Sequence, residues 1–589
     1  MSFKHICDSC QNFENGACEK HPKGYPTNID DFKRDGKIYV DCPDFKLSPE
    51  PIDQWHCDRC GEDFSSPEGK KPVLCPNPNC GKRLWLRKIP KAVLEERAEL
   101  EALGKITPEE LKEITAEMGP DELRKVLGLT IKHDDTNKLI HFLAGVLTYT
   151  ENSQVNISNR GPSSIGKSYL PIEISTLYFS KTDVQMIAYA SPTSFFHEVG
   201  EWDDEVRGYR VNLERKLLIF LDQPHDILLQ RLRPLLSHDQ KELVMKITDK
   251  REKKGMRTKS VIIRGFPTVF FCTGSLEIDE QEATRSFVLS PETTAEKIRE
   301  AIFLKASRKG NPIEYAKMLK QNPEREQLRK RVLLIKNTEI KNIIIKNPTN
   351  IAERFIESFP KLKPRHSRDI ERIISLAQGF ALLNLWNRER DSGTLYVNQR
   401  DIDNAFGLYA EIAECQELGI APYIYRVFKE VIGPLYYERN RSNEGGGGGK
   451  VGVERKDVVK RYFETYGRPL SDRALRKEIL PALESIGFIA EEEDPNDRRK
   501  KVIHVYSPTP ECPISPPKPP TKITDTIYAI LSELESQYDG GVPADLARGE
   551  AEKQGISREV FRSFVKEAKT RGHIYEPRPG CLSLTIKGE

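Results

Sequence analysis

The stretch Gly161-Pro-Ser-Ser-Ile-Gly-Lys-Ser168 decides the fold expected for the centre of this 589-residue chain. It matches the pattern G-x-x-x-x-G-K-[ST] in full. It also follows a predicted strand near Val155–Ser158 and precedes an apolar stretch with helical character. In such a loop the backbone N–H groups form an anion nest, the lysine reaches the β- and γ-phosphates, and the final hydroxyl holds Mg²⁺. The pattern therefore predicts an ATP site in which Ser168 binds Mg²⁺. The residues of this cradle are Gly161, Pro162, Ser163, Ser164, Ile165, Gly166, Lys167 and Ser168.

A site of this kind also needs a buried strand that ends in an acid. The run Lys216-Leu-Leu-Ile-Phe-Leu-Asp222-Gln223 has five apolar residues before Asp222, as expected for a strand covered on both faces. Asp222 is predicted to anchor the Mg²⁺ shell. Gln223 stands where a glutamate commonly polarises the attacking water, and an amide cannot take a proton. It could orient water, as the glutamine of small GTPases does, or another carboxylate such as Asp226 or Glu201 could act as the base.

A basic hairpin is predicted between this strand and the next buried one, Thr268–Cys272. Leu243–Ile247 and Ser260–Arg264 have the composition of strands, and a turn centred on Gly255 joins them. The hairpin could be a solvated charged edge, or a finger that contacts nucleic-acid phosphates with little sequence preference. We favour the finger, because the hairpin directly precedes a buried strand. Its predicted DNA-binding residues are Lys250, Arg251, Lys253, Lys254, Arg257 and Lys259.

The cysteines indicate metal rather than disulfides. Eight of the 12 lie within the first 80 residues, and the chain is too long for a small disulfide scaffold. Cys57, Cys60, Cys75 and Cys80 form two close pairs that can place four thiolates around one Zn²⁺, which predicts a zinc ribbon. Cys7, Cys10, Cys18 and Cys42 have less regular spacing. For these four, zinc is the first expectation, and an iron–sulfur cluster or untied cysteines are the alternatives.

The overall composition excludes several classes of protein. The chain has 92 Lys and Arg against 89 Asp and Glu, a net charge of +3, and a hydrophobic fraction of 38%. A wholly disordered chain would be less apolar and more strongly charged. The apolar runs are shorter than the ~20 residues of a membrane span, and the amino end lacks the apolar region of a secretory signal. We therefore expect a cytoplasmic protein with no membrane association, whose nucleic-acid footprint is local.

Two similar segments are predicted at the carboxyl end, after a linker that contains five consecutive glycines. Residues 451–506 have the order helix, helix, hairpin of a winged helix, with Arg473, Arg476 and Lys477 on a candidate recognition helix. Residues 523–589 repeat this form. Duplex DNA is the expected partner of both segments, and a protein-docking role is the alternative.

The order of these features resembles the AAA+ ATPases, and within them the minichromosome-maintenance-like helicases of plasmids, viruses or integrated elements. The likeness covers roughly residues 134–415 and implies that Gly161–Ser168 is Walker A and Leu217–Gln223 is Walker B. It also implies that Lys246–Arg264 is the pre-sensor hairpin of the helicase channel. By the same resemblance Thr273 is sensor 1, Arg285 is a finger offered to a neighbour's nucleotide, and Arg368 is sensor 2. An ordinary surface or capping arginine remains the alternative for both arginines.

The expected fold is multidomain, with zinc-binding N-terminal modules, an α/β P-loop AAA+ core with an α-helical lid, and tandem C-terminal winged helices. The expected function is that of an ATP-dependent DNA helicase or translocase in DNA replication, working as a homo-hexameric ring around single-stranded DNA. The catalytic set would be Lys167, Asp222, Gln223, Thr273, Arg285 and Arg368. The alternative is an ATP-switched DNA-binding initiator or regulator with little unwinding activity. The expected domains are a Cys-rich module (1–50), a zinc ribbon (51–90), a helical connector (91–133), the ATPase core with its lid (134–440), a Gly-rich linker (441–450), a winged helix (451–506), a Pro-rich linker (507–522) and a second winged helix (523–589).

Overall fold

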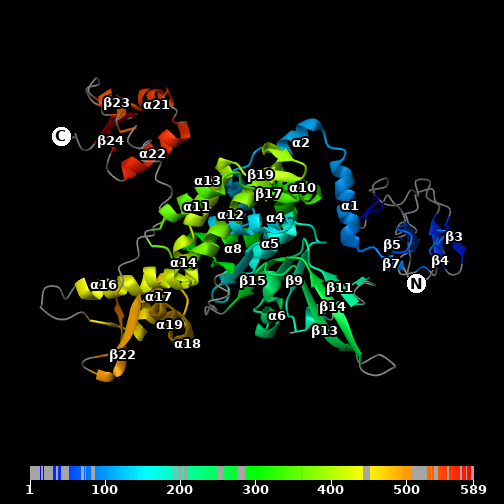
Figure 1. Cartoon of the computed structure of the whole chain (residues 1–589), viewed down its shortest axis with the longest axis horizontal. Helices are drawn as coiled ribbons and strands as arrows, with labels where there is room; N and C mark the ends of the chain where they lie inside the picture. The colour runs from blue at the N-terminus through cyan, green and yellow to red at the C-terminus, as the bar shows by residue number, and fades with distance from the viewer. Residues whose placement is uncertain are drawn as a thin grey trace. The chain divides into compact units, whose positions relative to one another are not determined.

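In the computed structural model, five strands form a parallel sheet at the centre of the chain (Figure 1). The strand order is β16-β8-β15-β12-β9, and every neighbouring pair is parallel. The predicted α/β core is therefore confirmed. Since a parallel sheet is covered on both faces, several of its strands are largely apolar, as in Leu-Leu-Ile-Phe of β12, whereas β8 is mostly polar. The strands are β8 (Asn156–Arg160), β9 (Val184–Ile187), β12 (Leu217–Phe220), β15 (Thr268–Thr273) and β16 (Ser286–Leu289).

Helices cover both faces of this sheet. One face shares a core with α4 (Asp135–Leu147), α5 (Tyr169–Tyr178) and α12 (His366–Leu383), in which Phe270 and Phe287 are fully buried. On the other face, Phe220 and Phe271 pack with residues of α6 (Asp226–Leu236). The helices therefore leave the two ends of the strands uncovered, and we call these ends the carboxyl edge and the amino edge of the sheet. Loops at either edge can carry a site.

A second sheet contains the predicted basic hairpin. Its order is β10-β11-β14-β13, and β13 pairs with β14 in antiparallel register from Glu242↔Arg264 to Asp249↔Arg257. The hairpin prediction is confirmed for these two strands, and the turn between them lies outside the described residues. The strands are β10 (Glu201–Asp203), β11 (Gly208–Asn212), β13 (Glu242–Asp249) and β14 (Arg257–Arg264).

A helical region follows the last strand of the parallel sheet. Its helices are α8 (Ala295–Gly310), α9 (Pro312–Lys320), α10 (Pro323–Asn337), α11 (Pro348–Glu357), α12, α13 (Gln399–Ala410) and α14 (Ala413–Leu418). A small sheet lies among them, formed by β17 (Asn342–Ile344), β18 (Arg390–Asp391) and β19 (Thr394–Tyr396).

The next helices share one core with the first helix–helix–hairpin module. Ile424, Phe428 and Val431 are buried together with Val458, Leu483 and other side chains of the module. Two segments form π-helical turns, Phe428–Ile432 and Leu475–Ile479. The next residue, Gly433 or Leu480, donates its N–H to the carbonyl five residues earlier, and a proline follows it. These wider turns accommodate a proline that cannot donate a hydrogen bond. The elements are α15 (Pro422–Val427), α16 (Gly433–Arg441), β20 (Val453–Glu454), α17 (Arg455–Tyr466), α18 (Asp472–Ala474), α19 (Leu480–Ser485), β21 (Ile489–Asp494) and β22 (Asp497–Val505).

The last module has its own core, which includes Val542, Phe561, Phe564 and Leu582. It repeats the helix–helix–hairpin order that the sequence predicts. Its elements are β23 (Val542–Pro543), α21 (Ala544–Lys553), α22 (Arg558–Thr570), β24 (Ile574–Arg578) and β25 (Cys581–Leu584).

The chain divides into two compact units, residues 1–105 and 106–589, and the border falls inside the predicted connector. The connector contains α1 (Lys91–Leu103) in the first unit and α2 (Pro108–Thr115) and α3 (Pro120–Leu127) in the second. The hydroxyl of Thr107 caps α2 by accepting the Glu110 N–H. The strands of the first unit are β1 (Phe13–Glu14), β2 (Ala17–Cys18), β3 (Asp31–Arg34), β4 (Lys37–Val40), β5 (Ile52–Cys57), β6 (Asp63–Pro67) and β7 (Leu86–Lys88).

The structure describes the backbone of β1 to β4 and then residues 52–67, 72, 75–77, 79–80, 86–191, 193–196, 201–203, 208–249, 257–274, 285–359, 361–441, 451–494, 497–506, 527–528, 530–531, 534–535, 541–553, 556, 558–570, 574–578 and 580–584. Among these residues no helix has both the length and the apolar character needed to cross a membrane.

Candidate functional site

The predicted phosphate loop connects β8 to α5, at the edge of the sheet where the parallel strands end. Gly161 directly follows the last residue of β8, and Ser168 is the residue before the first turn of α5. This is the edge at which ligands bind in open α/β sheets, because loops and helix N-termini converge there. The loop therefore lies where an anion would meet backbone N–H groups.

Three residues of the loop have positive φ angles. They are Gly161 at +151°, Ser164 at +68° and Gly166 at +93°. A Cβ on Gly161 would also lie 2.3 Å from Cδ1 of Ile165, so this position is both strained and crowded for any other residue. Left-handed backbone in a short loop turns successive N–H groups toward one centre, which is the geometry of an anion nest.

Lys167 and Ser168 follow these turns at the end of the loop. Both are partly buried, and Ser168 makes no side-chain capping bond to α5, so its hydroxyl is not used by the helix. A Cβ on Gly274 would lie 4.0 Å from the Nζ of Lys167, which places the ammonium beside the end of β15. Burial raises the pKa of the nearby Cys272 thiol to about 12, so that thiol stays protonated and neutral.

Asp222 and Gln223 lie at the same edge, just beyond β12. The Asp222 side chain is exposed, and its Oδ1 accepts the Gln223 backbone N–H at 2.8 Å. The Oε1 atom of Gln223 is buried and has no hydrogen-bond partner among the described residues. A buried acceptor without a donor is costly, so a water or another donor at this position would be held by the amide.

Thr273 ends the strand that lies between the loop strand and the Asp222 strand. It is buried and pairs in register with Arg160, the last residue of β8. On the other side Phe271 pairs with Phe220, two residues before Asp222. Arg160 and Thr273 are therefore neighbours at the ends of their strands, and Asp222 follows the end of the next strand by two residues, so the three positions form a row along the ends of three neighbouring strands. A polar side chain in the middle of this row can contact both a bound phosphate and a water beside Asp222.

Polar residues that were not predicted from the sequence lie behind the loop. Arg160 is fully buried, and its Nε donates to the Ser158 hydroxyl at 3.0 Å. Asn159 lies 2.9 Å from Nε2 of His141 in α4, while Nδ1 of His141 lies 2.7 Å from the Asn137 carbonyl. Burial lowers the pKa of His141 to about 4, so the ring is neutral and bridges α4 to the loop strand. The sequence Asn-Ile-Ser-Asn-Arg could have indicated these residues, because it is unusually polar for a buried strand.

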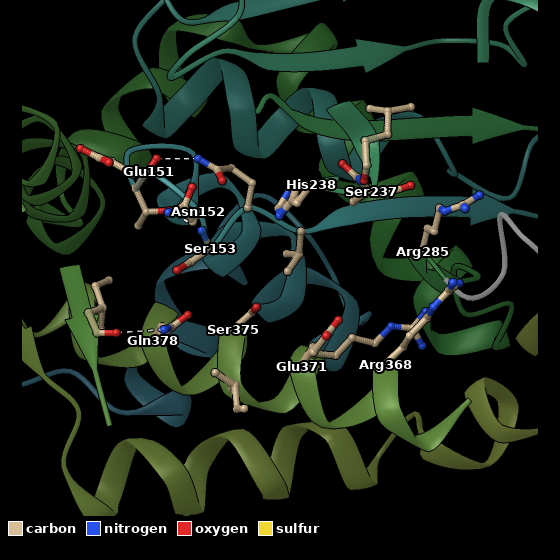
Figure 2. A pocket seen from close by; sticks show the side chains of 18 of the residues that line it. Glu151, Asn152, Ser153, Ser237, His238, Arg285, Arg368, Glu371, Ser375 and Gln378 are labelled. Carbon is tan, nitrogen blue, oxygen red and sulfur yellow. Dashed lines mark hydrogen bonds between the residues drawn. The ribbon is translucent and has the colours of Figure 1, made fainter. Parts of the chain in front are cut away.

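Arg285 and Arg368 lie elsewhere, at the opposite edge of the sheet. Both line a cavity of about 840 Å³ between the start of β8, the start of β16 and α12. Figure 2 shows them at the same end of this cavity, with Glu371 beside Arg368. Arg285 immediately precedes Ser286, which pairs with Asn156 at the start of β8. The length of β8, ~13 Å at ~3.3 Å per residue, therefore separates Arg285 from the loop of its own chain.

The start of α12 is held firmly at this edge. Arg372 is buried, and its guanidinium donates to Asp369 at 2.9 Å and to the Ser286 carbonyl at 2.7 Å. Arg365 also donates to Asp369, at 3.0 Å. These bonds attach α12 to β16 and fix the position from which the exposed Arg368 projects.

Four cysteines in the first unit form a possible metal centre. The sulfur atoms of Cys57, Cys60, Cys75 and Cys80 all lie within 4.8 Å of one another, and the Cys57–Cys80 and Cys60–Cys75 pairs are 3.6 Å apart. Sulfurs at the corners of a tetrahedron with Zn–S bonds of ~2.3 Å would be ~3.8 Å apart. The Cys60 backbone N–H helps to lower the pKa of Cys57 to about 7, which favours the thiolate. The four side chains can therefore hold a metal ion.

The remaining predicted site residues lie partly or wholly outside the described part of the chain. Cys7, Cys10 and Cys42 are outside it, and Cys18 is described only as part of the β2 backbone. Of the hairpin cations, Lys250, Arg251, Lys253 and Lys254 also lie outside it, whereas Arg257 and Lys259 belong to β14.

No family model matches the sequence, and a comparison with curated proteins finds no match.

Proposed function

We propose that this chain is an ATPase that couples ATP hydrolysis to the unwinding of DNA or to translocation along it. The observation that carries the proposal is the loop Gly161–Ser168 at the carboxyl edge of a parallel sheet, with Asp222 and Thr273 at the same edge. The glycine turns and the α5 N-terminus would bind the phosphates, and Lys167 would neutralise the β- and γ-oxygens. Mg²⁺ would be held by Ser168 and Asp222, where it neutralises charge that develops on the transferred phosphoryl group.

We assign the positioning of the attacking water and of the γ-phosphate to Gln223 and Thr273, which lie beside the loop. Gln223 would accept a hydrogen bond from the attacking water through its buried Oε1, and Thr273 would contact the γ-phosphate from the strand between. Phosphoryl transfer needs positioning and charge neutralisation more than covalent chemistry, so an amide in this position is compatible with turnover.

Assembly into a ring, expected to be a homo-hexamer, would complete each site. Arg285 and Arg368 are a strand length away from the loop of their own chain, and they line one cavity together. A neighbouring copy that brings its loop edge against this edge would place its nucleotide near both arginines, which would act in trans. This arrangement makes nucleotide binding and subunit contact depend on each other.

DNA is the proposed substrate because basic elements accompany the ATPase core. The hairpin of β13 and β14 would contact backbone phosphates of a single strand, and the modules at 453–505 and 542–584 would bind duplex DNA as winged helices. Zn²⁺ is proposed at Cys57, Cys60, Cys75 and Cys80, and a second Zn²⁺ at Cys7, Cys10, Cys18 and Cys42. A closed set of four thiolates leaves no open position for catalysis, so both metals would be structural.

A second candidate function is an ATP-switched initiator or regulator, which the amide at Gln223 favours. Here ATP would assemble the protein on DNA, and hydrolysis would be slow. Steady-state ATPase measured with and without single-stranded DNA separates the two functions. A helicase should be stimulated several-fold by single-stranded DNA, whereas a rate that stays at its basal level supports the switch.

Mutation of the hairpin tests the proposed coupling. Replacing Lys253, Lys254 and Arg257 with alanine should abolish strand separation while ATP binding is retained, and should lower the salt slope of DNA binding by about one unit per lost phosphate contact. Normal unwinding by this variant would refute the proposed contact between the hairpin and DNA.

A further inference from the structure

Helix α8 presents an unusual exposed surface. None of its 16 residues is buried, and Ile298, Ile302 and Phe303 are 50%, 62% and 64% exposed. Ile298, Ile302, Lys305 and Lys309 follow one another at intervals of four, three and four residues, so they form a single stripe along the helix. We call these four residues the α8 stripe. Apolar side chains clustered on an exposed helix and flanked by charges are typical of a protein-binding surface.

The α8 stripe belongs to the side of the molecule that carries the phosphate loop. Arg308 of α8 pairs with Glu173 of α5, the helix that follows the loop, at 3.1 Å. Lys297 pairs with Asp134, the residue that precedes α4. These two contacts fix α8 beside the loop helix, and the stripe lies about a quarter turn around the helix from them.

A complementary surface lies on α11, at the side that carries Arg368. Glu353, Ile356 and Glu357 are exposed on one face of this helix, and the opposite face buries Ile351 and Phe355. We call the three exposed residues the α11 face. It leads through the exposed Leu362 to the start of α12, from which Arg368 projects.

The two surfaces match in spacing and in charge. The α8 stripe has two lysines four residues apart, and the α11 face has two glutamates four residues apart, each set with isoleucine beside it. None of these four charged side chains forms an ion pair with a residue that the structure describes. Opposite charges around an apolar centre steer association and set its register.

We propose that the α8 stripe of one copy docks onto the α11 face of the next copy of this chain. The inference rests on the proposed function, because this contact would bring Arg285 and Arg368 of one copy to the phosphate loop of its neighbour. The two surfaces differ, so the contact is heterologous, and repetition around an axis closes a ring.

Charge reversal in the full-length protein tests the contact. Variant K305E/K309E makes both surfaces acidic, and variant E353K/E357K makes both basic. With Mg²⁺ and a non-hydrolysable ATP analogue, each variant alone should need a protein concentration at least ~10-fold higher for half-assembly, measured by sedimentation velocity. An equimolar mixture should assemble like the wild type, because every contact in an alternating ring then joins a basic surface to an acidic one. The quadruple variant should recover in the same way.

The control is K456E/K460E, which reverses two exposed lysines four residues apart on α17 and should leave assembly unchanged. Circular dichroism checks that each variant is folded. Wild-type assembly by either single-surface variant would overturn the proposal, and so would a mixture that stays dissociated. A wild-type chain that remains monomeric would overturn both this contact and the proposed ring. Loss of ATP binding on mutation of Lys167 is a separate readout and tests the nucleotide site alone.

Discussion

Replacement of Gln223 by glutamate should turn the candidate site into a faster ATPase. The two side chains have the same shape, and the backbone N–H at this position is already held by Asp222 Oδ1 at 2.8 Å, so the loop should not move. A positioned general base contributes ~10²–10⁴-fold to a rate. The amide would already orient water through its buried Oε1, so we expect an increase at or below the lower end of this range, about 10- to 100-fold in kcat.

The pH dependence gives the prediction a second readout. A carboxyl group at the buried position of Oε1 would have a pKa above its usual value, because burial disfavours the charged form. The base works only when ionised, so the extra activity should be present at high pH and lost as the pH falls through that raised pKa. The wild type, with an amide that does not titrate there, should lack this step.

The assay is steady-state phosphate release from Mg-ATP, with binding of the ATP analogue measured in parallel. Gln223→Ala is the matched control and should be slower than the wild type, since it removes the water contact without adding a base. A Gln223→Glu variant that binds nucleotide normally but gains no activity would refute the assignment of Gln223 to the attacking water.

Three further predictions concern nucleotide, metal and packing. Lys167→Ala should weaken ATP-analogue binding about 10- to 100-fold in calorimetry, because one charge-assisted hydrogen bond is worth ~1.5–3 kcal/mol, and Lys320→Ala, on the exposed end of α9, should bind normally. Protein purified without added metal should contain close to two equivalents of zinc, and Cys60→Ser should lose one of them; a metal content unchanged by Cys60→Ser would exclude the four-cysteine site. Tyr462→Phe removes the hydroxyl that accepts from Arg468 Nε at 2.8 Å and should destabilise the module at 453–505 by ~1–3 kcal/mol, seen as faster amide exchange there; unchanged exchange would contradict the role of this contact.

Local sequence patterns were sufficient to predict the elements that carry the phosphate loop. A polar loop with two glycines between a strand and an apolar helix is a contiguous signal, and the structure has β8, the loop and α5 in that order. The strand ending before Asp222 and the hairpin of β13 and β14 were predicted for the same reason, because five or more apolar or alternating residues determine a strand on their own.

The relations between elements could not be predicted in this way. Strand order brings Thr273 between the loop strand and Asp222, and it depends on packing between residues far apart in the chain. The same holds for Arg285 and Arg368, which line one cavity although they are 83 positions apart in the numbering. Short strands such as β17 and β18 have too few residues to show a period, so the sequence gives no sign of their small sheet.

The core shared by α15, α16 and the 453–505 module attaches this module to the preceding helices by side-chain packing. Gln416 bonds both the N–H and the carbonyl of Val288 in β16, and Val288 itself belongs to this shared core. A shift of the strand that follows Arg285 would therefore reach the module through these packed side chains. Cleavage of the chain within the glycine run should leave the module attached. A truncation after Arg441 would instead expose the buried apolar side chains of Ile424, Phe428 and Val431 to solvent. A deletion meant to remove this module should therefore begin before α15.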